Sequence, residues 1–119
     1  MKTILIIDDE AYFSKTVEAT LDPKKYKVIA AIDGIEGLKM IEESAPDAIL
    51  LDINMPKMNG MEVLKKLHEK KNRIPIIITS NLSSRQTISE GVELGIRGYI
   101  VKSDESLTAI ANTIEDLFR

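Results

Sequence analysis

The sequence predicts an α/β domain of the (βα)5 type, with a doubly wound, five-stranded parallel sheet of strand order 2-1-3-4-5. Three observations support this prediction. The chain has 119 residues, the length of one ordinary domain. Five short apolar runs occur along it, and segments compatible with helix follow each of them. Right-handed crossovers between the strands would place helices on both faces of the sheet.

The five apolar runs are predicted to be buried strands. They are continuously apolar rather than alternating, which is typical of a parallel sheet covered on both faces. The runs are Ile4–Ile7, Val28–Ile32, Ala48–Leu51, Ile76–Ile78 and Tyr99–Val101.

Helices are expected where apolar residues recur at helical spacing, and the last segment of the chain has the cleanest apolar stripe. The fourth segment, roughly Ser83 to Leu94, has the weakest helix signal because it contains Gly91 and several Ser and Thr residues. The apolar positions of the other segments are Phe13, Val17 and Leu21; Ile35, Leu38 and Ile41; Val63, Leu64 and Leu67; and Leu107, Ile110, Ala111, Ile114, Leu117 and Phe118.

Charge and composition argue against several classes of protein. The net charge is −3, and the lysines around Lys65 and Lys70 are interrupted by glutamates, so we expect no nucleic-acid contact by this domain. Without cysteine, a disulfide framework or a thiolate metal site is excluded. The apolar runs are too short to span a membrane, and no signal-peptide pattern opens the chain. We therefore expect a cytoplasmic protein without membrane contact.

Acidic residues follow the first and third predicted strands. Asp8, Asp9 and Glu10 come after the first, and Asp52 comes after the third. In the predicted strand order both ends reach the same crevice. Carboxylates brought together resist ionising jointly, and a divalent cation removes that conflict. Oxygen ligands without His or Cys suit Mg²⁺, with Mn²⁺ as the alternative ion.

Residues that suit a phosphoryl group follow the other two strand ends. Thr79 and Ser80 end the fourth strand, and Lys102 follows the fifth. A hydroxyl and an ammonium beside a metal ion can hold phosphoryl oxygens. Asp52 would then be the nucleophile that forms an acyl phosphate. Four separate strand ends thus carry residues fitted to one site.

Each of these residues also has a plain structural interpretation. The acids after the first strand could cap or charge the start of the next helix. Asp52 could open an Asx-turn before Pro56. Thr79 is at home in a strand, and a lone Lys102 is more often solvated than functional. These readings stay open for single residues, and the four strand ends together favour the site.

At these positions the sequence resembles the receiver domain of two-component response regulators, over essentially the whole chain. The proline four residues and the glycine eight residues after Asp52 form a specific signature. The resemblance implies a flavodoxin-like, CheY-like fold, and one receiver domain over residues 1–119 without an output domain. The matching segments are Ile6-Ile7-Asp8-Asp9-Glu10, Leu50-Leu51-Asp52-Ile53-Asn54-Met55-Pro56-Lys57-Met58-Asn59-Gly60, Ile78-Thr79-Ser80 and Gly98-Tyr99-Ile100-Val101-Lys102.

The resemblance implies a signalling phosphoacceptor whose only chemistry is its own phosphorylation and dephosphorylation, not an enzyme with a separate substrate. Asp52 would accept a phosphoryl group from the phosphohistidine of a sensor histidine kinase or a phosphotransfer protein. Asp9 and Asp52 would bind Mg²⁺ directly, and Asp8 mostly through water. Asn54 would contribute its backbone carbonyl.

The resemblance also implies how the event is passed on. Lys102 would pair with the phosphoryl oxygens, the Thr79 hydroxyl would move onto the group, and Tyr99 would turn inward behind it. Three positions would tune the lifetime of the phosphoryl group: Asn54, Ser80 and Asn81.

The expected output is a change in the face made by the fourth helix, the fifth strand and the fifth helix. A downstream protein or a second copy of the chain would bind there, although an ordinary solvated surface is the alternative reading. Residues of mixed charge expected on this face are Arg85, Glu90, Glu93, Arg97 and Asp104.

One position departs from the pattern of many receivers, which have Pro after the lysine. Ser103 follows Lys102 here, so we expect a trans peptide bond. Ser103 or Asp104 is expected to be the N-cap of the last helix. The Gly-Tyr-x-x-Lys run without Pro is similar to receivers often joined to helix-turn-helix DNA-binding domains.

Three other functions stay open. A small Mg²⁺-dependent aspartyl phosphatase of the haloacid-dehalogenase type needs Asp-x-Asp, whereas Asp8 and Asp9 are adjacent. A flavodoxin-like cofactor binder needs a phosphate loop of backbone amides where this chain has acids. A receiver used only as a phosphorylation-independent docking module is compatible with the same residues.

His68, the only histidine, is predicted to be a surface residue.

Overall fold

The computed structural model describes residues 1–55, 58–81 and 85–119. Pro56 and Lys57 of the signature after Asp52 lie outside the described residues, as does Ser83, the expected start of the fourth helix. The side chain of Arg85 is likewise outside them.

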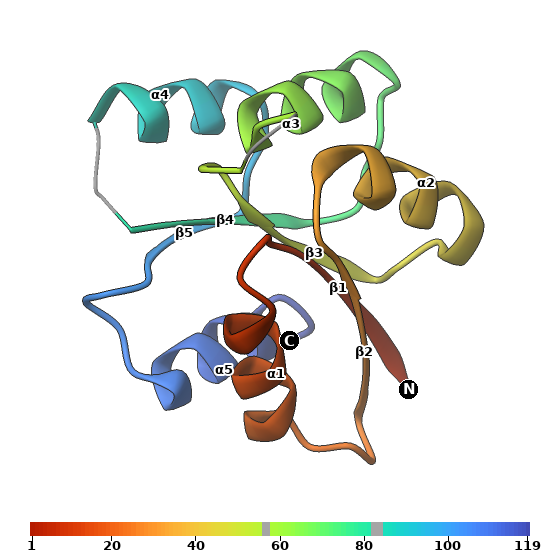
Figure 1. Cartoon of the computed structure of the whole chain (residues 1–119), viewed down its shortest axis with the longest axis vertical. Helices are drawn as coiled ribbons and strands as arrows, with labels where there is room; N and C mark the ends of the chain where they lie inside the picture. The colour runs from red at the N-terminus through yellow and green to blue at the C-terminus, as the bar shows by residue number, and fades with distance from the viewer. Residues whose placement is uncertain (56–57, 82–84) are drawn as a thin grey trace.

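Five parallel strands form one sheet of order β2-β1-β3-β4-β5, which confirms the predicted topology (Figure 1). Consecutive β-α-β units run from β1 to β2 on one side and from β3 to β5 on the other, so the strand order reverses between β1 and β3. The strands are β1 Lys2–Ile7, β2 Tyr26–Ala31, β3 Ala48–Asp52, β4 Ile76–Ser80 and β5 Gly98–Val101.

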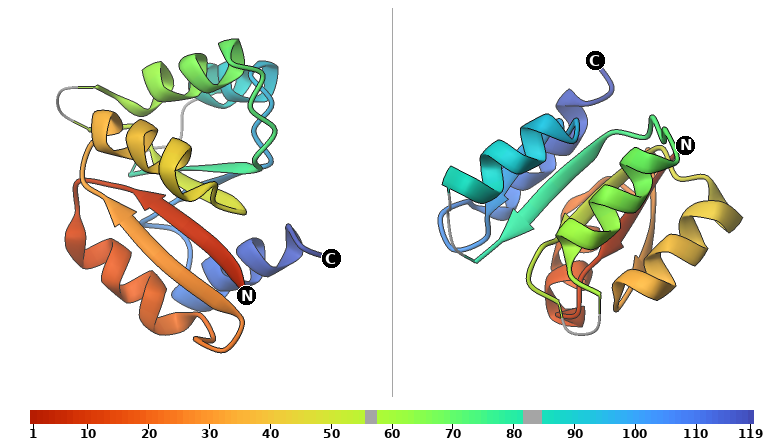
Figure 2. Two further views of the ribbon diagram at one scale, coloured as in Figure 1. Left: turned by 90° about the vertical axis from the view of Figure 1, so that its right-hand side faces the viewer. Right: turned by 90° about the horizontal axis from the view of Figure 1, so that it is seen from above.

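Helices cover both faces of the sheet, so the molecule has three layers (Figures 1 and 2). Two helices, α1 Ala11–Thr20 and α5 Leu107–Asp116, lie on one face. The other three lie on the opposite face: α2 Gly34–Ser44, α3 Gly60–Glu69 and α4 Arg85–Glu93.

Successive side chains of the central strands supply two separate cores. Leu5 and Ile7 belong to the cluster under α2 and α3, whereas Ile4 and Ile6 belong to the cluster under α1 and α5. This is the two-sided burial that a continuously apolar strand predicts. The pattern fails at the end of the second run, because β2 is an edge strand and Ile32, beyond its last residue, is 57% exposed.

Two helix expectations were wrong in detail. Ile35 is 59% exposed, because α2 turns Gly37 toward Ile7 of the sheet and Gly34 toward Met58 and Val63 of the α3 region instead. A Cβ on Gly37 would lie 2.6 Å from Ile7 Cδ1, so the glycine allows this close approach. The N-cap of α5 is Ser106, whose side chain accepts the Ala109 N–H, and not Ser103 or Asp104.

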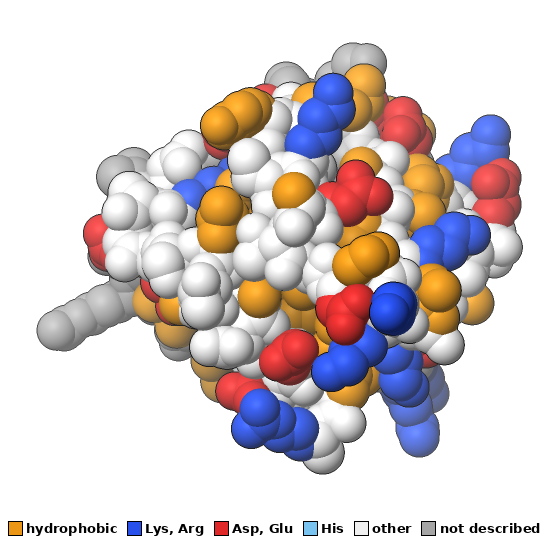
Figure 3. Space-filling model, turned by 90° about the horizontal axis from the view of Figure 1, so that it is seen from below, with side chains coloured by type: hydrophobic (Ala, Val, Ile, Leu, Met, Phe, Trp, Pro, Cys, Tyr) orange, Lys and Arg blue, Asp and Glu red, His pale blue; other side chains and the backbone are white. Residues whose placement is uncertain are grey.

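Among the residues that the structure describes, none of the helices combines the length and the apolar character that a membrane span needs. Figure 3 shows the side of the molecule that carries α1 and α5, where acidic and basic side chains are interspersed among apolar ones.

Candidate phosphoryl and metal site

Parallel register brings four strand ends to the same edge of the sheet. Ile7 pairs with Leu51, so Asp8 and Asp52 extend from neighbouring strands. Asp52 in turn pairs with Thr79 on β4. Lys102 follows β5 and donates its backbone N–H to the Ser80 carbonyl at 2.7 Å. Residues 94 positions apart in the sequence, Asp8 and Lys102, are thereby placed in one crevice.

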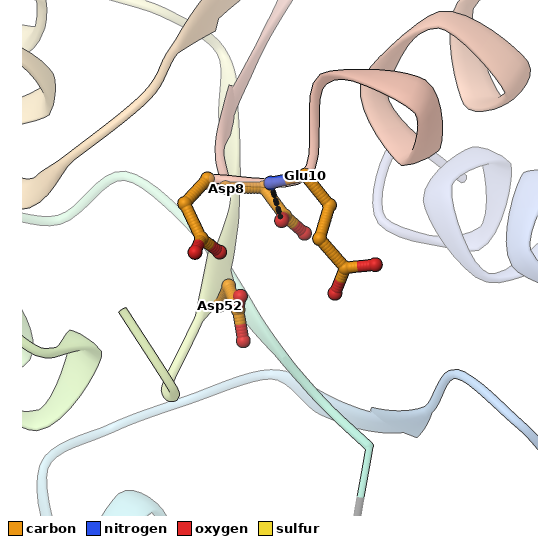
Figure 4. Close-up of side chains that lie close together, drawn as sticks. Asp8, Glu10 and Asp52 are labelled. Atoms are coloured by element: carbon orange, nitrogen blue, oxygen red, sulfur yellow. Dashed lines mark hydrogen bonds between the residues drawn. The ribbon is translucent and has the colours of Figure 1, made fainter. Parts of the chain in front are cut away.

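Four carboxylates converge in this crevice (Figure 4). One carboxylate oxygen from each of Asp8, Asp9, Glu10 and Asp52 lies within 4.8 Å of the others. Asp8 and Asp52 are buried, whereas Asp9 and Glu10 are exposed. The prediction that the first and third strands bring their acids together is confirmed. Glu10 also belongs to this cluster of carboxylates, in which only the three aspartates were expected.

The turn interpretation of Asp52 is also correct and coexists with the site, and Asp8, which was expected at most to cap or charge the next helix, makes a bond of the same kind. Asp52 Oδ1 accepts the Asn54 N–H at 3.0 Å, and Asp8 Oδ1 accepts the Glu10 N–H at 2.8 Å. These Asx-type bonds use one oxygen of each carboxylate and leave Oδ2 facing Lys102. Glu10, the N-cap residue of α1, makes no side-chain capping bond, so the capping interpretation fails for that residue.

Lys102 is the cation of the site, and its side chain is only 7% exposed. Its Nζ lies 2.6 Å from Asp8 Oδ2, 3.0 Å from Glu10 Oε1 and 3.6 Å from Asp52 Oδ2. The ammonium also lies 4.4 Å from the centroid of the Phe13 ring. Sequence reasoning assigned Phe13 only to the core and gave Glu10 no role here. Their spacing of three residues at a helix start was the available signal.

The buried charges perturb one another. Burial, and next the charge of Asp8, raise the pKa of Asp52 from 3.8 to about 7, against the opposing effects of Lys102 and the Asn54 N–H. Burial also raises the pKa of Asp8. The hydrogen bond from Lys102 lowers the pKa of Glu10. Burial disfavours the charged form of Lys102, but its bonds to Asp8 and Glu10 outweigh this and raise its pKa. One ammonium therefore leaves these carboxylates with excess negative charge.

The other predicted residues lie around this cluster. Thr79 is buried, and its Oγ1 has no hydrogen-bond partner among the described residues. The Asn54 side chain donates to Ser80 Oγ at 3.2 Å, and the side chain of Asn81 hydrogen-bonds that of Glu10. Tyr99 is half-buried and packs against the core on the α2–α3 side. The positions expected to tune lifetime thus touch the site, and their roles stay predictions.

Gly60 explains part of the signature that follows Asp52. It begins α3 and donates its N–H to the Ile53 carbonyl at 3.0 Å. A Cβ at this position would lie 2.3 Å from the Asp52 carbonyl oxygen and 2.6 Å from Ile53 Cα. Only a residue without Cβ lets α3 begin this close to the backbone of the site.

The connection after Lys102 forms a turn in which Asp104 donates its N–H to the Val101 carbonyl at 3.0 Å. There is no cis peptide bond within the described part of the chain, so the expectation of a trans Lys102–Ser103 bond is confirmed. The turn delays the start of α5 to Leu107, which is why Ser106 rather than Ser103 or Asp104 caps it.

A protein-family model described as "Response regulator receiver domain" matches residues 4–113. The chain is 38% identical over 101 residues to the alkaline phosphatase synthesis transcriptional regulatory protein PhoP of Bacillus subtilis, a match that covers 85% of this chain and 42% of PhoP. The chain therefore spans less than half the length of this relative.

Solved structures match the fold over nearly the whole chain. The chemotaxis protein CheY4 of Vibrio cholerae gives a TM-score of 0.88 at 29% identity, with 98% of each chain covered. A chain of the CheX–CheY–BeF3–Mg²⁺ complex of Borrelia burgdorferi gives 0.89 at 25% identity, covering 99% of this chain and 90% of that one.

Proposed function

Because the chain belongs to the response regulator receiver domain family, we propose that it is a switch that accepts a phosphoryl group on Asp52. One observation carries the proposal. The Asp52 carboxylate, the Lys102 ammonium and the Thr79 hydroxyl, which has no partner among the residues that the structure describes, meet at one edge of the sheet beside the carboxylates of Asp8 and Asp9.

The proposed donor is a phosphohistidine of a sensor histidine kinase or a phosphotransfer protein. An oxygen of Asp52 attacks phosphorus, the P–N bond to the histidine breaks, and the released imidazole takes up a proton. The candidate nucleophile is Oδ2, because Oδ1 is held by the Asn54 N–H and Oδ2 faces Lys102. Hydrolysis of the acyl phosphate ends the cycle, so the chain acts as a signalling protein and not on a separate substrate.

The residues present fit a hard divalent cation, Mg²⁺ or Mn²⁺. The donor set consists of carboxylates within 4.8 Å of one another, and a single ammonium does not neutralise them. Asp8, Asp9 and Asp52 would hold the ion, together with the backbone carbonyl of Asn54. When bound, it supplies positive charge for the phosphoryl oxygens. The related Borrelia burgdorferi complex contains BeF3 and Mg²⁺, which supports this choice of ion.

The proposed response begins at Thr79. Its buried hydroxyl lacks a partner among the described residues, and a phosphoryl oxygen on Asp52 would supply one. Tyr99 lies on β5, the edge strand next to β4, and pairs in register with Ile78, the residue before Thr79. We propose that these two residues pass the change to the α4–β5–α5 face. A downstream protein or a second copy of the chain would bind there.

The domain and its location complete the proposal. Residues 1–119 would act as one receiver unit in the cytoplasm, where a kinase presents its phosphohistidine. The domain itself would make no contact with nucleic acid or membrane.

Labelling with a small phosphodonor such as acetyl phosphate, in the presence of Mg²⁺, tests the assignment of Asp52. Asp52→Asn should abolish labelling, whereas Asp22→Asn, the same change at an exposed loop position, should leave it intact. Equal labelling of Asp52→Asn and the wild type would show that Asp52 is not the acceptor.

A second measurement separates the switch from a docking module. Beryllofluoride with Mg²⁺ should shift the amide NMR signals of Thr79, Tyr99 and α4. Shifts confined to the metal-binding residues would favour a module that works without phosphorylation.

A further inference from the structure

Two residues at the start of α1, outside the expected site, hold the Lys102 ammonium. Glu10 Oε1 lies 3.0 Å from Lys102 Nζ, and the Phe13 ring centroid lies 4.4 Å from it. Residues three apart share one face of a helix, so the first turn of α1 presents both side chains to the end of β5. Figure 4 shows Glu10 beside Asp8, across the crevice from Asp52.

The three carboxylates share this ammonium unequally. Asp8 at 2.6 Å and Glu10 at 3.0 Å are within hydrogen-bonding distance of Nζ, whereas Asp52 at 3.6 Å is beyond it. Lys102 is therefore hydrogen-bonded to Glu10 and closely ion-paired with Asp8, whereas its ion pair with the proposed phosphoacceptor is longer.

We propose that Glu10 is a positioning residue that competes with the phosphoryl group for Lys102, an inference that rests on the proposed function. When Asp52 is modified, Lys102 must turn one of its three N–H groups toward a phosphoryl oxygen, and its close contacts with Asp8 and Glu10 resist that turn. Its bond to Glu10 is the one that gives way, because the Glu10 side chain is 51% exposed and regains water on release. Asp8 is 1% exposed, so losing its ammonium would leave a buried carboxylate unpaired at greater cost.

The surrounding side chains fit such an exchange. The Phe13 ring contacts Lys102 independently of either acid, and so keeps the ammonium at the crevice while its partner changes. The Asn81 side chain already hydrogen-bonds Glu10 and remains as its partner after release. Glu10 thus favours the unmodified state, since the phosphoryl group has to displace it.

The consequence is measurable with beryllofluoride as the probe. Glu10→Gln should bind beryllofluoride about two- to fivefold more tightly than the wild type does. This is the range expected when a partly exposed ion pair is removed. The titration uses the whole chain with saturating Mg²⁺, followed by amide NMR at Thr79. Glu10 makes no capping bond for α1, so the variant should fold, and thermal unfolding checks this.

Two controls separate competition from general charge effects. Glu18→Gln removes the same charge from an exposed position about two turns further along α1 and should leave the affinity unchanged. A double-mutant cycle with Lys102→Gln tests the route, since an effect transmitted through Lys102 should vanish in that background. Direct repulsion between Glu10 and the anion would persist there.

The proposal is overturned if Glu10→Gln and the wild type bind beryllofluoride equally, if Glu18→Gln gains as much affinity, or if the gain survives in the Lys102→Gln background. A tenfold loss of Mg²⁺ affinity in Glu10→Gln would instead make Glu10 a metal ligand and would also overturn it. A wild type that fails to bind beryllofluoride at all would refute the proposed function itself, which is a different result from an unchanged Glu10→Gln.

Discussion

Replacing Asp52 by asparagine is expected to stabilise the protein when divalent cations are removed. The Asp52 side chain is 2% exposed, and burial and the charge of Asp8 raise its pKa from 3.8 to about 7. Because this pKa is higher in the folded chain than in the unfolded one, folding favours the protonated form. The stability that Asp52 contributes is therefore complete below about pH 4 and is lost as the pH rises through about 7.

The size of the effect follows from that pKa. One pKa unit corresponds to about 1.4 kcal/mol, so ionised Asp52 lowers the free energy of unfolding by about 4 kcal/mol relative to its protonated form. Asparagine cannot ionise and can still accept the Asn54 N–H. At about pH 8 the variant should gain up to about 4 kcal/mol, or roughly 15 °C in Tm for a chain of this length. Near pH 4 the two proteins should differ by less than about 1 kcal/mol.

Urea unfolding with a chelator, followed by circular dichroism at both pH values, measures this difference. Asp22→Asn, the same substitution at an exposed position, should change the free energy of unfolding by less than about 0.5 kcal/mol. Mg²⁺ at ten times its Kd should stabilise the wild type by about 1.4 kcal/mol and so reduce the difference in free energy of unfolding between Asp52→Asn and the wild type. The reasoning is refuted if Asp52→Asn is no more stable than the wild type at pH 8, or if the difference in free energy of unfolding between the two proteins does not depend on pH.

Three further predictions use other features of the site. Mg²⁺ should bind more tightly as the pH rises from about 6 to about 8, because it displaces the proton that Asp52 holds with a pKa of about 7; an affinity independent of pH by calorimetry would contradict this. Thr79→Val keeps the side-chain shape and removes a buried hydroxyl that has no partner in the described part of the chain, so stability should be unchanged or about 1 kcal/mol higher. The beryllofluoride shifts in α4 should nevertheless disappear, and their persistence would exclude Thr79 as the link. Gly60→Ala should cost roughly 1–3 kcal/mol of unfolding free energy, because its Cβ would lie 2.3 Å from the Asp52 carbonyl oxygen. Gly98→Ala, whose Cβ would have no neighbour nearer than 3.5 Å, is the control, and equal costs would contradict the packing argument.

Strong local patterns predicted most of the fold. The apolar runs Ile4–Ile7, Ala48–Leu51 and Ile76–Ile78 are buried at every position, so neither face could be exposed without cost. Ile35 shows the limit of such reasoning, because its helical spacing fits a core position. The actual face of α2 is set by how closely Gly37 allows the helix to approach β1 and Gly34 allows it to approach α3. An apolar stripe does not reveal that the smallest residues mark the contact.

The site was predicted as a set of residues but not as a set of contacts. Asp8, Asp52, Thr79 and Lys102 each follow or end a strand, and parallel strands end at a common edge. Glu10 was seen only as part of an acidic run, and Phe13 only as a core residue. Their contact with Lys102 depends on where α1 sits relative to the end of β5, which no local pattern encodes.

The sequence by itself determined the succession of strands and helices, narrowed the strand order to the common doubly wound arrangement that fits five strands, and indicated the residues proposed to bind a cation and a phosphoryl group. These follow from short-range periodicity and from chemical type. The tertiary structure decided how the charged side chains interact. It sets which acids contact Lys102, which oxygen of Asp52 takes no part in the turn, and how far burial raises the pKa of Asp52. Such energies depend on distances of a few ångström and on exclusion of water, and only packing sets those quantities.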